Sequence, residues 1–110
     1  MTKEKVQLLA FDIIANSGEA KDYYVRAVRA AQAGEFENCD ALLKQGNDSI
    51  VKAHKSQTEL LNAEINGDDL PFSIILIHSQ DHLMTTISYE QSAKDTIEVY
   101  KKLASIESGK

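Results

Sequence analysis

Residues 74–84 read IILIHSQDHLM, and this stretch decides between the folds open to the chain. One alternative is a buried strand over Phe72–His78, because the run Phe-Ser-Ile-Ile-Leu-Ile has high β propensity. No second strand-like run is present to pair with it, and a single strand leaves its backbone donors and acceptors unsatisfied. A helix satisfies those groups within itself. We therefore predict a helix over residues 74–84.

The apolar run at the start of this helix covers more of the helix circumference than one three-helix bundle can bury. Four consecutive apolar residues, 74–77, span about 300° of a helix's circumference. An exposed stripe of this kind on a monomer favours aggregation, so we expect the chain to self-associate through this helix. Farther along, the same stripe becomes polar, with Asp81 and Ser88 at helical spacing.

Two further segments have apolar residues three and four apart, which is typical of amphipathic helices. The first runs from Thr2 to Gly34, and the second runs from about Glu35 to Asn66. The third helix is expected to have Pro71 in its first turn and to reach Leu103. Helices of about 30 residues, each ~45 Å long and joined by short turns, predict an all-α, antiparallel three-helix bundle.

Two local signals refine this prediction. Asn16, with Glu19 three residues later, has the form of a capping box and predicts a kink at which the first helix restarts. His54 falls on the expected inner face of the second helix. A single histidine in such a place is more often a hydrogen-bonded core residue than a catalyst, so we assign it to the core.

Length and charge limit the functions open to the chain. Its 110 residues form one domain, residues 1–110, whose tail is expected to fray from about residue 105. A net charge of −5 provides no cationic field for nucleic acid or an anionic bilayer. The longest apolar runs, Leu8–Phe11 and Ile74–Ile77, are far short of the ~20 residues needed for membrane insertion. The lone Cys39 and the lack of a leader favour a cytoplasmic location.

His78, Asp81 and His82 project from one side of the third helix, and three interpretations fit this spacing. His78 could be a nucleophile that takes up a phosphoryl group while a neighbouring acceptor fixes its tautomer. The three side chains could instead bind a metal ion, as in the two-histidine, one-carboxylate sites. In the third interpretation the cluster only satisfies its own hydrogen bonds within a packed helix pair.

The stretch His78–Met84 resembles the active-site motif of the IIA components of the lactose/cellobiose (N,N'-diacetylchitobiose) family of the bacterial phosphoenolpyruvate-dependent sugar phosphotransferase system. The resemblance extends over nearly the whole chain. Residues 18–20 (GEA), 33–36 (AGEF) and 53–60 (AHKSQTEL) are similar to other recurring stretches of that family, in the same order.

The resemblance implies a phosphotransferase that works as a homotrimer of three-helix bundles. His78 would accept phosphate from the phosphohistidine carrier protein and donate it to the sugar-specific IIB component. Asp81 from three subunits would meet around one divalent metal ion, usually Mg²⁺, on the threefold axis. Gln80 and His82 are placed to orient the imidazole or to solvate the phosphoryl oxygens.

The sugar itself stays open among lactose, cellobiose and diacetylchitobiose, because the sugar pocket belongs to the membrane IIC partner of such systems. A competing class of function is a non-catalytic trimeric scaffold, in which a metal ion or the polar stripe specifies the register of the helices, as a buried Asn does in a coiled coil.

Overall fold

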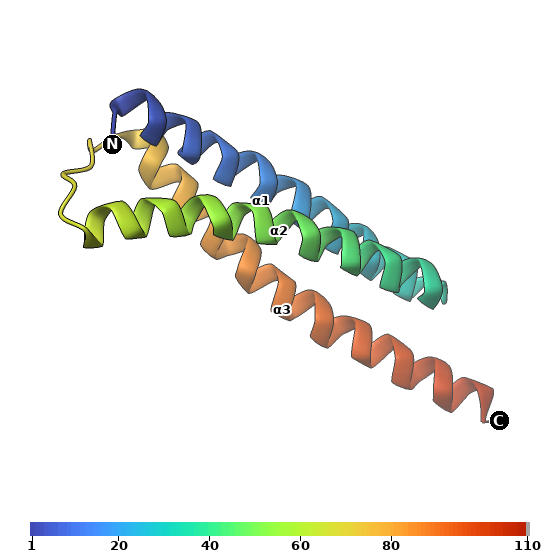
Figure 1. The fold of residues 1–110 in the computed structure, drawn as a ribbon. Helices are drawn as coiled ribbons and strands as arrows, with labels where there is room; N and C mark the ends of the chain where they lie inside the picture. Colours follow the sequence, from blue (N-terminus) through green and yellow to red (C-terminus); the bar gives the residue numbers. More distant parts are fainter. Residues whose placement is uncertain (110) are drawn as a thin grey trace.

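The computed structural model describes residues 1–109, which form three α-helices (Figure 1). These are α1 (Lys3–Gln32), α2 (Phe36–Ile65) and α3 (Ile74–Ser108). No strand occurs among residues 1–109, so the all-α prediction is confirmed. The helices run up, down and up, and the molecule is 62 Å long but only 18–19 Å wide.

Short connections set this alternation of direction. Gly34 and Gly67 have φ values of +79° and +96°, in the left-handed region that favours glycine, and each lies just after a helix. The predicted bounds of the second helix, Glu35 and Asn66, are the two residues that flank α2. The turns therefore lie where the glycines predict them.

The backbone of α1 lies close to both of the other helices, whereas α2 and α3 lie farther apart and meet through side chains such as Leu42 and Ile97. The largest fully buried side chains include Tyr24 and Ile13 from α1 and Ile97 from α3. In Figure 1 the ribbons of α3 and α2 diverge toward the C-terminus, where side chains still join them, as Lys101 Nζ lies 3.5 Å from Asp40 Oδ1. The bundle is therefore centred on α1, with an open side between α2 and α3.

The predicted restart of the first helix is wrong, because α1 continues without interruption through residues 16–19. Asn16 does not act as a cap. Its side-chain Nδ2 donates to the carbonyl oxygen of Asp12 at 2.9 Å, one turn back, so the amide is used inside the helix.

The third helix begins and ends later than predicted. Pro71 lies outside α3, whose N-cap is Ser73, and the Ser73 hydroxyl accepts from the backbone N–H of Leu76 at 3.1 Å. That hydrogen bond satisfies a first-turn donor, which is why the helix begins there. At the other end α3 continues past Leu103, and residues 105–108 are helical. Lys110, the last residue of the predicted frayed tail, lies outside the described residues.

The expected inner face of α2 is only partly buried. Cys39 and Ile50 are buried as predicted, but His54, Leu61 and Ile65 are exposed, the last by 79%. The core assignment of His54 is therefore wrong for the single chain. At about 100° per residue, these three side chains lie together to one side of the buried residues Ala53 and Leu60, so the packed face of α2 does not include them.

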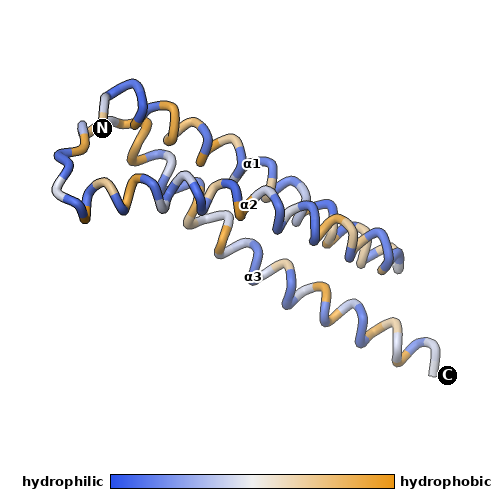
Figure 2. Tube along the Cα trace, in the orientation of Figure 1, coloured by the Kyte–Doolittle hydropathy of each residue, from blue (hydrophilic) through white to orange (hydrophobic). Residues whose placement is uncertain are grey.

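Helix α3 has two apolar faces on opposite sides. The face toward the core is buried and includes Leu83, Ala93 and Ile97. At about 100° per residue, a second set of large apolar side chains lies roughly opposite. We call this second set the outer face, and its members are Ile74, Ile77, Met84, Val99, Leu103 and Ile106, which are 42–83% exposed. Figure 2 shows apolar residues recurring along the whole of α3, including its C-terminal half.

Among residues 1–109, no helix combines the length and the apolar character needed to cross a membrane.

Candidate functional site

The imidazoles of His78 and His82 lie together on α3, one helical turn apart. Their ring centroids are 4.6 Å apart and the ring planes are perpendicular, an edge-to-face contact. His78 is exposed and His82 is half-buried. The pair therefore combines an accessible nitrogen nucleophile with a neighbouring ring that restricts its orientation.

Asp81 is exposed and lies on the outer face of α3, between Ile77 and Met84. Among residues 1–109 no three His, Cys, Asp or Glu side chains gather as a metal site. The interpretation of His78, Asp81 and His82 as a complete metal site within one chain is therefore wrong. A single chain contributes one carboxylate at this place, and any ion bound there needs further ligands from outside the chain.

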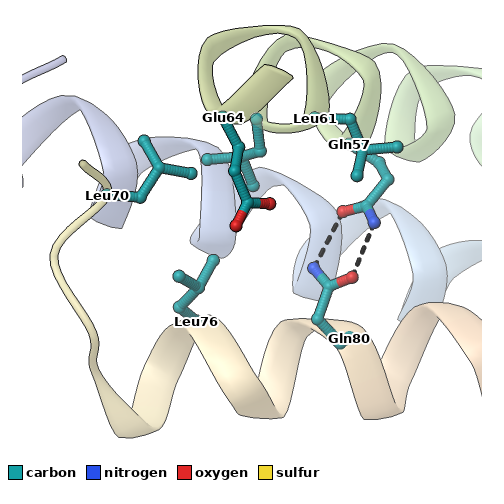
Figure 3. A pocket seen from close by; sticks show the side chains of 7 residues that line it. Gln57, Leu61, Glu64, Leu70, Leu76 and Gln80 are labelled. Atoms are coloured by element: carbon teal, nitrogen blue, oxygen red, sulfur yellow. Dashed lines mark hydrogen bonds between the residues drawn. The ribbon is translucent and has the colours of Figure 1, made fainter. Parts of the chain in front are cut away.

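Gln80 turns away from His78 and toward α2. Residues two apart on a helix do not share a face, and Gln80 lies across the outer face from His78. Its amide pairs with that of Gln57 in α2 (Figure 3). Gln57 Nε2 donates to Gln80 Oε1 at 2.6 Å, and Gln80 Nε2 donates to Gln57 Oε1 at 2.8 Å. Within one chain, then, His82 meets His78 as predicted, but Gln80 does not.

Ser79, the residue between His78 and Gln80, is fully buried and contacts this pair. Its hydroxyl donates to the carbonyl oxygen of Leu76 at 2.6 Å and lies 3.2 Å from Gln80 Nε2. We call the three side chains of Gln57, Ser79 and Gln80 the amide clasp. The clasp is the side-chain hydrogen-bond link between α2 and α3 at the histidine end of the bundle.

A hollow of about 200 Å³ lies beside the clasp, in the open side between α2 and α3. Leucines from both helices and from the loop form most of its wall, namely Leu60, Leu61, Leu70 and Leu76. The carboxylate of Glu64 and the two clasp amides supply its polar atoms.

Cys39 is a free, buried thiol. Burial raises the pKa of Cys39 above its ordinary value of 9.0, and the negative charge of Asp40 adds to that effect. Its thiolate is disfavoured, so the side chain acts as a small apolar core residue, as predicted.

Sequence reasoning missed the role of Gln57. The residue stands inside the stretch Ala53–Leu60, which was among those that carried the resemblance. The spacing of apolar residues could not show that an amide there reaches across to α3. The signal available was only its place in a stretch similar to a known family.

Comparison with known proteins identifies the chain as a protein of the sugar phosphotransferase system. Residues 8–101 match the family model described as "PTS system, Lactose/Cellobiose specific IIA subunit". The chain therefore belongs to the family of lactose/cellobiose-specific IIA subunits.

Relatives and solved structures agree with this assignment. The chain is 47% identical over 102 residues to the PTS system lactose-specific EIIA component of Staphylococcus aureus, covering 93% of this chain and 99% of the relative. The crystal structure of the PTS cellobiose-specific enzyme IIA from Bacillus anthracis superposes with a TM-score of 0.89 at 35% identity, over 96% of this chain and 94% of that one. A chain from the solution structures of the Escherichia coli IIA(Chitobiose)–HPr complex superposes with a TM-score of 0.75 at 30% identity, over 90% and 96%.

Proposed function

We propose that the chain is a phosphoryl relay whose intermediate is phosphohistidine at His78. The observation that carries the proposal is the exposed His78 imidazole, held edge to face by His82, in a chain of the IIA family. Membership of the family supports a role in phosphoryl transfer and sugar uptake. The position of the phosphate on His78 is our inference from its exposure and its chemistry.

The proposed step is an in-line transfer between two imidazoles. A neutral nitrogen of His78 attacks the phosphorus of the carrier's phosphohistidine, so that a new P–N bond forms as the carrier's P–N bond breaks. The other ring nitrogen of His78 carries its proton throughout, and a hydrogen-bond acceptor near that nitrogen favours the attacking tautomer. The phosphoryl group then leaves for the IIB component by the reverse chemistry. Tight stabilisation on His78 would slow that second step.

We propose that three chains assemble through the outer faces of α3. These apolar side chains are exposed in the single chain, and they lie opposite the face that packs on α1. Burying them against copies of themselves removes apolar surface from water, at about 25 cal/mol per Å². A closed ring of three parallel α3 helices lets every copy cover its neighbours.

Such a ring brings Asp81 of each chain toward the threefold axis, because Asp81 lies among the outer-face residues. Three carboxylates at close range repel one another strongly. A divalent cation with a preference for hard oxygen ligands, most simply Mg²⁺, neutralises that repulsion, so we propose one ion per trimer. The residues fit this role, since Asp81 is exposed and no side-chain hydrogen bond within residues 1–109 engages its carboxylate oxygens.

The ring also places His78 beside a neighbouring subunit. At about 100° per residue, His78 and Gln80 lie on opposite flanks of the outer face. In a ring of identical helices, one flank of each helix meets the other flank of the next. His78 of one chain therefore meets Gln80 of its neighbour, and the site is complete only in the assembly.

We infer the donor and the acceptor of phosphate from membership of the family. The Escherichia coli relative forms a complex with HPr, which supports a phosphocarrier as the donor here. We propose a sugar-specific IIB component as the acceptor and an indirect link to a membrane IIC component, with lactose, cellobiose or diacetylchitobiose as the sugar. The proposed location is the cytoplasm.

Incubation with labelled phosphoenolpyruvate and the general phosphotransferase enzymes tests the relay. The chain should gain one acid-labile phosphate, and His78→Ala should gain none. His54→Ala is the matched control, because His54 is an exposed histidine on α2, and it should label as the parent does. A scaffold without catalytic role would gain no phosphate in any of the three proteins. Labelling of His78→Ala would show that another residue is the acceptor.

A further inference from the structure

The amide clasp fixes which atoms Gln80 can offer to another group. Gln57 and Gln80 exchange two hydrogen bonds, at 2.6 and 2.8 Å, in the reciprocal pattern of paired amides. Exchanging oxygen and nitrogen in both amides at once would preserve that pair. The pair alone therefore does not decide which end of Gln80 is the donor.

Ser79 decides it. The Ser79 hydroxyl has one proton, and that proton is donated to the Leu76 carbonyl oxygen at 2.6 Å. Toward Gln80 the same hydroxyl can only accept, so the atom 3.2 Å away must be the Gln80 nitrogen. Since Ser79 is fully buried, water does not compete for this place. The buried Ser79 thus fixes which atom of each amide in the clasp is the donor and which is the acceptor.

Counting donors and acceptors then leaves Gln80 with one free position. Both of its N–H groups are engaged, one by Gln57 and one by Ser79. Its Oε1 accepts from Gln57 Nε2 and has a second lone pair unused. In the clasp, Gln80 can accept a further hydrogen bond but cannot donate one.

We infer that Gln57 and Ser79 are positioning residues, which hold Gln80 as an acceptor for the ring N–H of the neighbouring subunit's His78. This inference rests on the proposed function, because it takes His78 as the nucleophile and the trimer as the active form. An acceptor for that N–H selects the tautomer whose other nitrogen attacks phosphorus. In this arrangement Gln80 acts on the nucleophile before transfer, and donation to the phosphoryl oxygens would require the clasp to open.

The variant Gln57→Glu tests the clasp through its dependence on pH. As a carboxylate, the new side chain can accept from Gln80 Nε2 but has no proton to give to Gln80 Oε1. A neutral carboxyl restores the reciprocal pair. Glu64 is the titratable side chain that lines the adjacent hollow within residues 1–109, and its negative charge favours protonation of the introduced group above its ordinary ~4.3.

The measurement is the rate of phosphate uptake from the phosphorylated carrier, expressed relative to the parent at each pH. For Gln57→Glu we expect a loss of about tenfold at neutral pH, the effect of one lost orienting hydrogen bond, and recovery toward the parent as the pH falls to about 5. Gln45→Glu is the matched control, since Gln45 is exposed on the same helix, and it should follow the parent throughout.

The ¹⁵N shifts of the His78 ring provide a second measurement. The parent should populate mainly one neutral tautomer, and both Gln57→Glu at neutral pH and Ser79→Ala should shift that ratio. If Gln57→Glu is folded and takes up phosphate at the parent's rate at every pH, the inference is overturned. If that variant does not fold, a parent-like tautomer ratio in Ser79→Ala overturns it instead. If the parent takes no phosphate on His78, the proposed function itself is refuted. Failure of the proposed function is therefore distinguishable from failure of the inference about the clasp.

Discussion

The ring of Tyr24 in α1 lies against the backbone of Gly46 in α2. A Cβ atom placed on Gly46 would come within 2.6 Å of Tyr24 Cε1 and 2.9 Å of Cδ1. Real side chains do not approach so closely, so the aromatic ring occupies the space that any other residue at position 46 would need. The hydroxyl of the same tyrosine donates to Asn47 Oδ1 at 2.8 Å, which fixes the ring in this place.

Gly46→Ala should therefore destabilise the fold, although alanine is the better helix former. Overpacking costs about 1–3 kcal/mol, whereas the gain in helix propensity is about 1 kcal/mol. Gly18→Ala is the control, because nothing lies within 4 Å of a Cβ at that helical position, and it should stabilise the protein. Chemical denaturation of both variants measures the difference. A Gly46→Ala variant more stable than Gly18→Ala would contradict the close contact.

Tyr24 also predicts a loss of stability at alkaline pH. Burial, followed by the negative charge of nearby Glu90, raises the pKa of Tyr24 well above its ordinary value of 10.0. The folded chain keeps the phenolic proton at a pH where the unfolded chain has lost it, so the stabilisation is complete below pH 10 and declines as the pH rises further. Tyr24→Phe should start from a lower free energy of unfolding at pH 7, by about 1 kcal/mol for the lost hydrogen bond. It should then lose less than the parent between pH 10 and 11. Equal losses in the two proteins would contradict the shift.

The proposed trimer predicts that one charge on the outer face separates the subunits. Leu103 is 47% exposed in the single chain and lies on the outer face, so Leu103→Glu would place three carboxylates inside the assembly. Analytical ultracentrifugation should show a trimer for the parent and a monomer for this variant. Val51→Glu changes an equally apolar residue on α2, 64% exposed and away from that face, and should remain trimeric.

Asp81→Leu tests the proposed metal ion separately from the apolar contacts. Replacing the three carboxylates by apolar side chains removes their repulsion and with it the need for a cation. A chelator should weaken the parent trimer but leave the variant assembled, as measured by sedimentation. Dissociation of the variant under conditions where the parent stays trimeric would count against the role given to Asp81.

His82 is predicted to act on His78 mainly through the contact of the two rings. His82→Phe keeps a planar ring at the 4.6 Å centroid distance, whereas His82→Ala leaves His78 free to rotate. The phosphorylation rate should therefore fall further in His82→Ala than in His82→Phe, by a factor of about ten. Equal losses in both variants would assign the effect to a nitrogen of His82 instead.

Much of the fold follows from the sequence because it depends on local rules. The apolar spacing and the glycines at 34 and 67 predict three helices and their turns, and each predicted end of α2 lies one residue from the observed end. Two local predictions failed. Asn16 was expected to cap a restarted helix, but its side chain bonds to a backbone carbonyl within α1. The third helix was expected to include Pro71, but it begins after the N-cap Ser73.

The arrangement of helices and the candidate site depend on contacts between distant residues, which spacing does not report. His54 was assigned to the core because its spacing placed it on the expected inner face of α2, but the packed face of α2 contains Ala53 and Leu60 and leaves His54 exposed. The His78–His82 contact was predictable, since the two residues are one turn apart. The pairing of Gln57 with Gln80 joins residues 23 apart in sequence, and only the folded structure shows it.

The two-sided character of α3 ties folding to protein concentration. The half of this helix beyond Ala93 has α1 on one side and, in a lone chain, water on the side of Val99 and Ile106. If copies of the chain supply the missing cover, part of the free energy of folding is gained only on association, and the melting temperature must rise with total protein. In a dilute cell extract, the last turns of this helix would be the first backbone to exchange its amide protons with solvent.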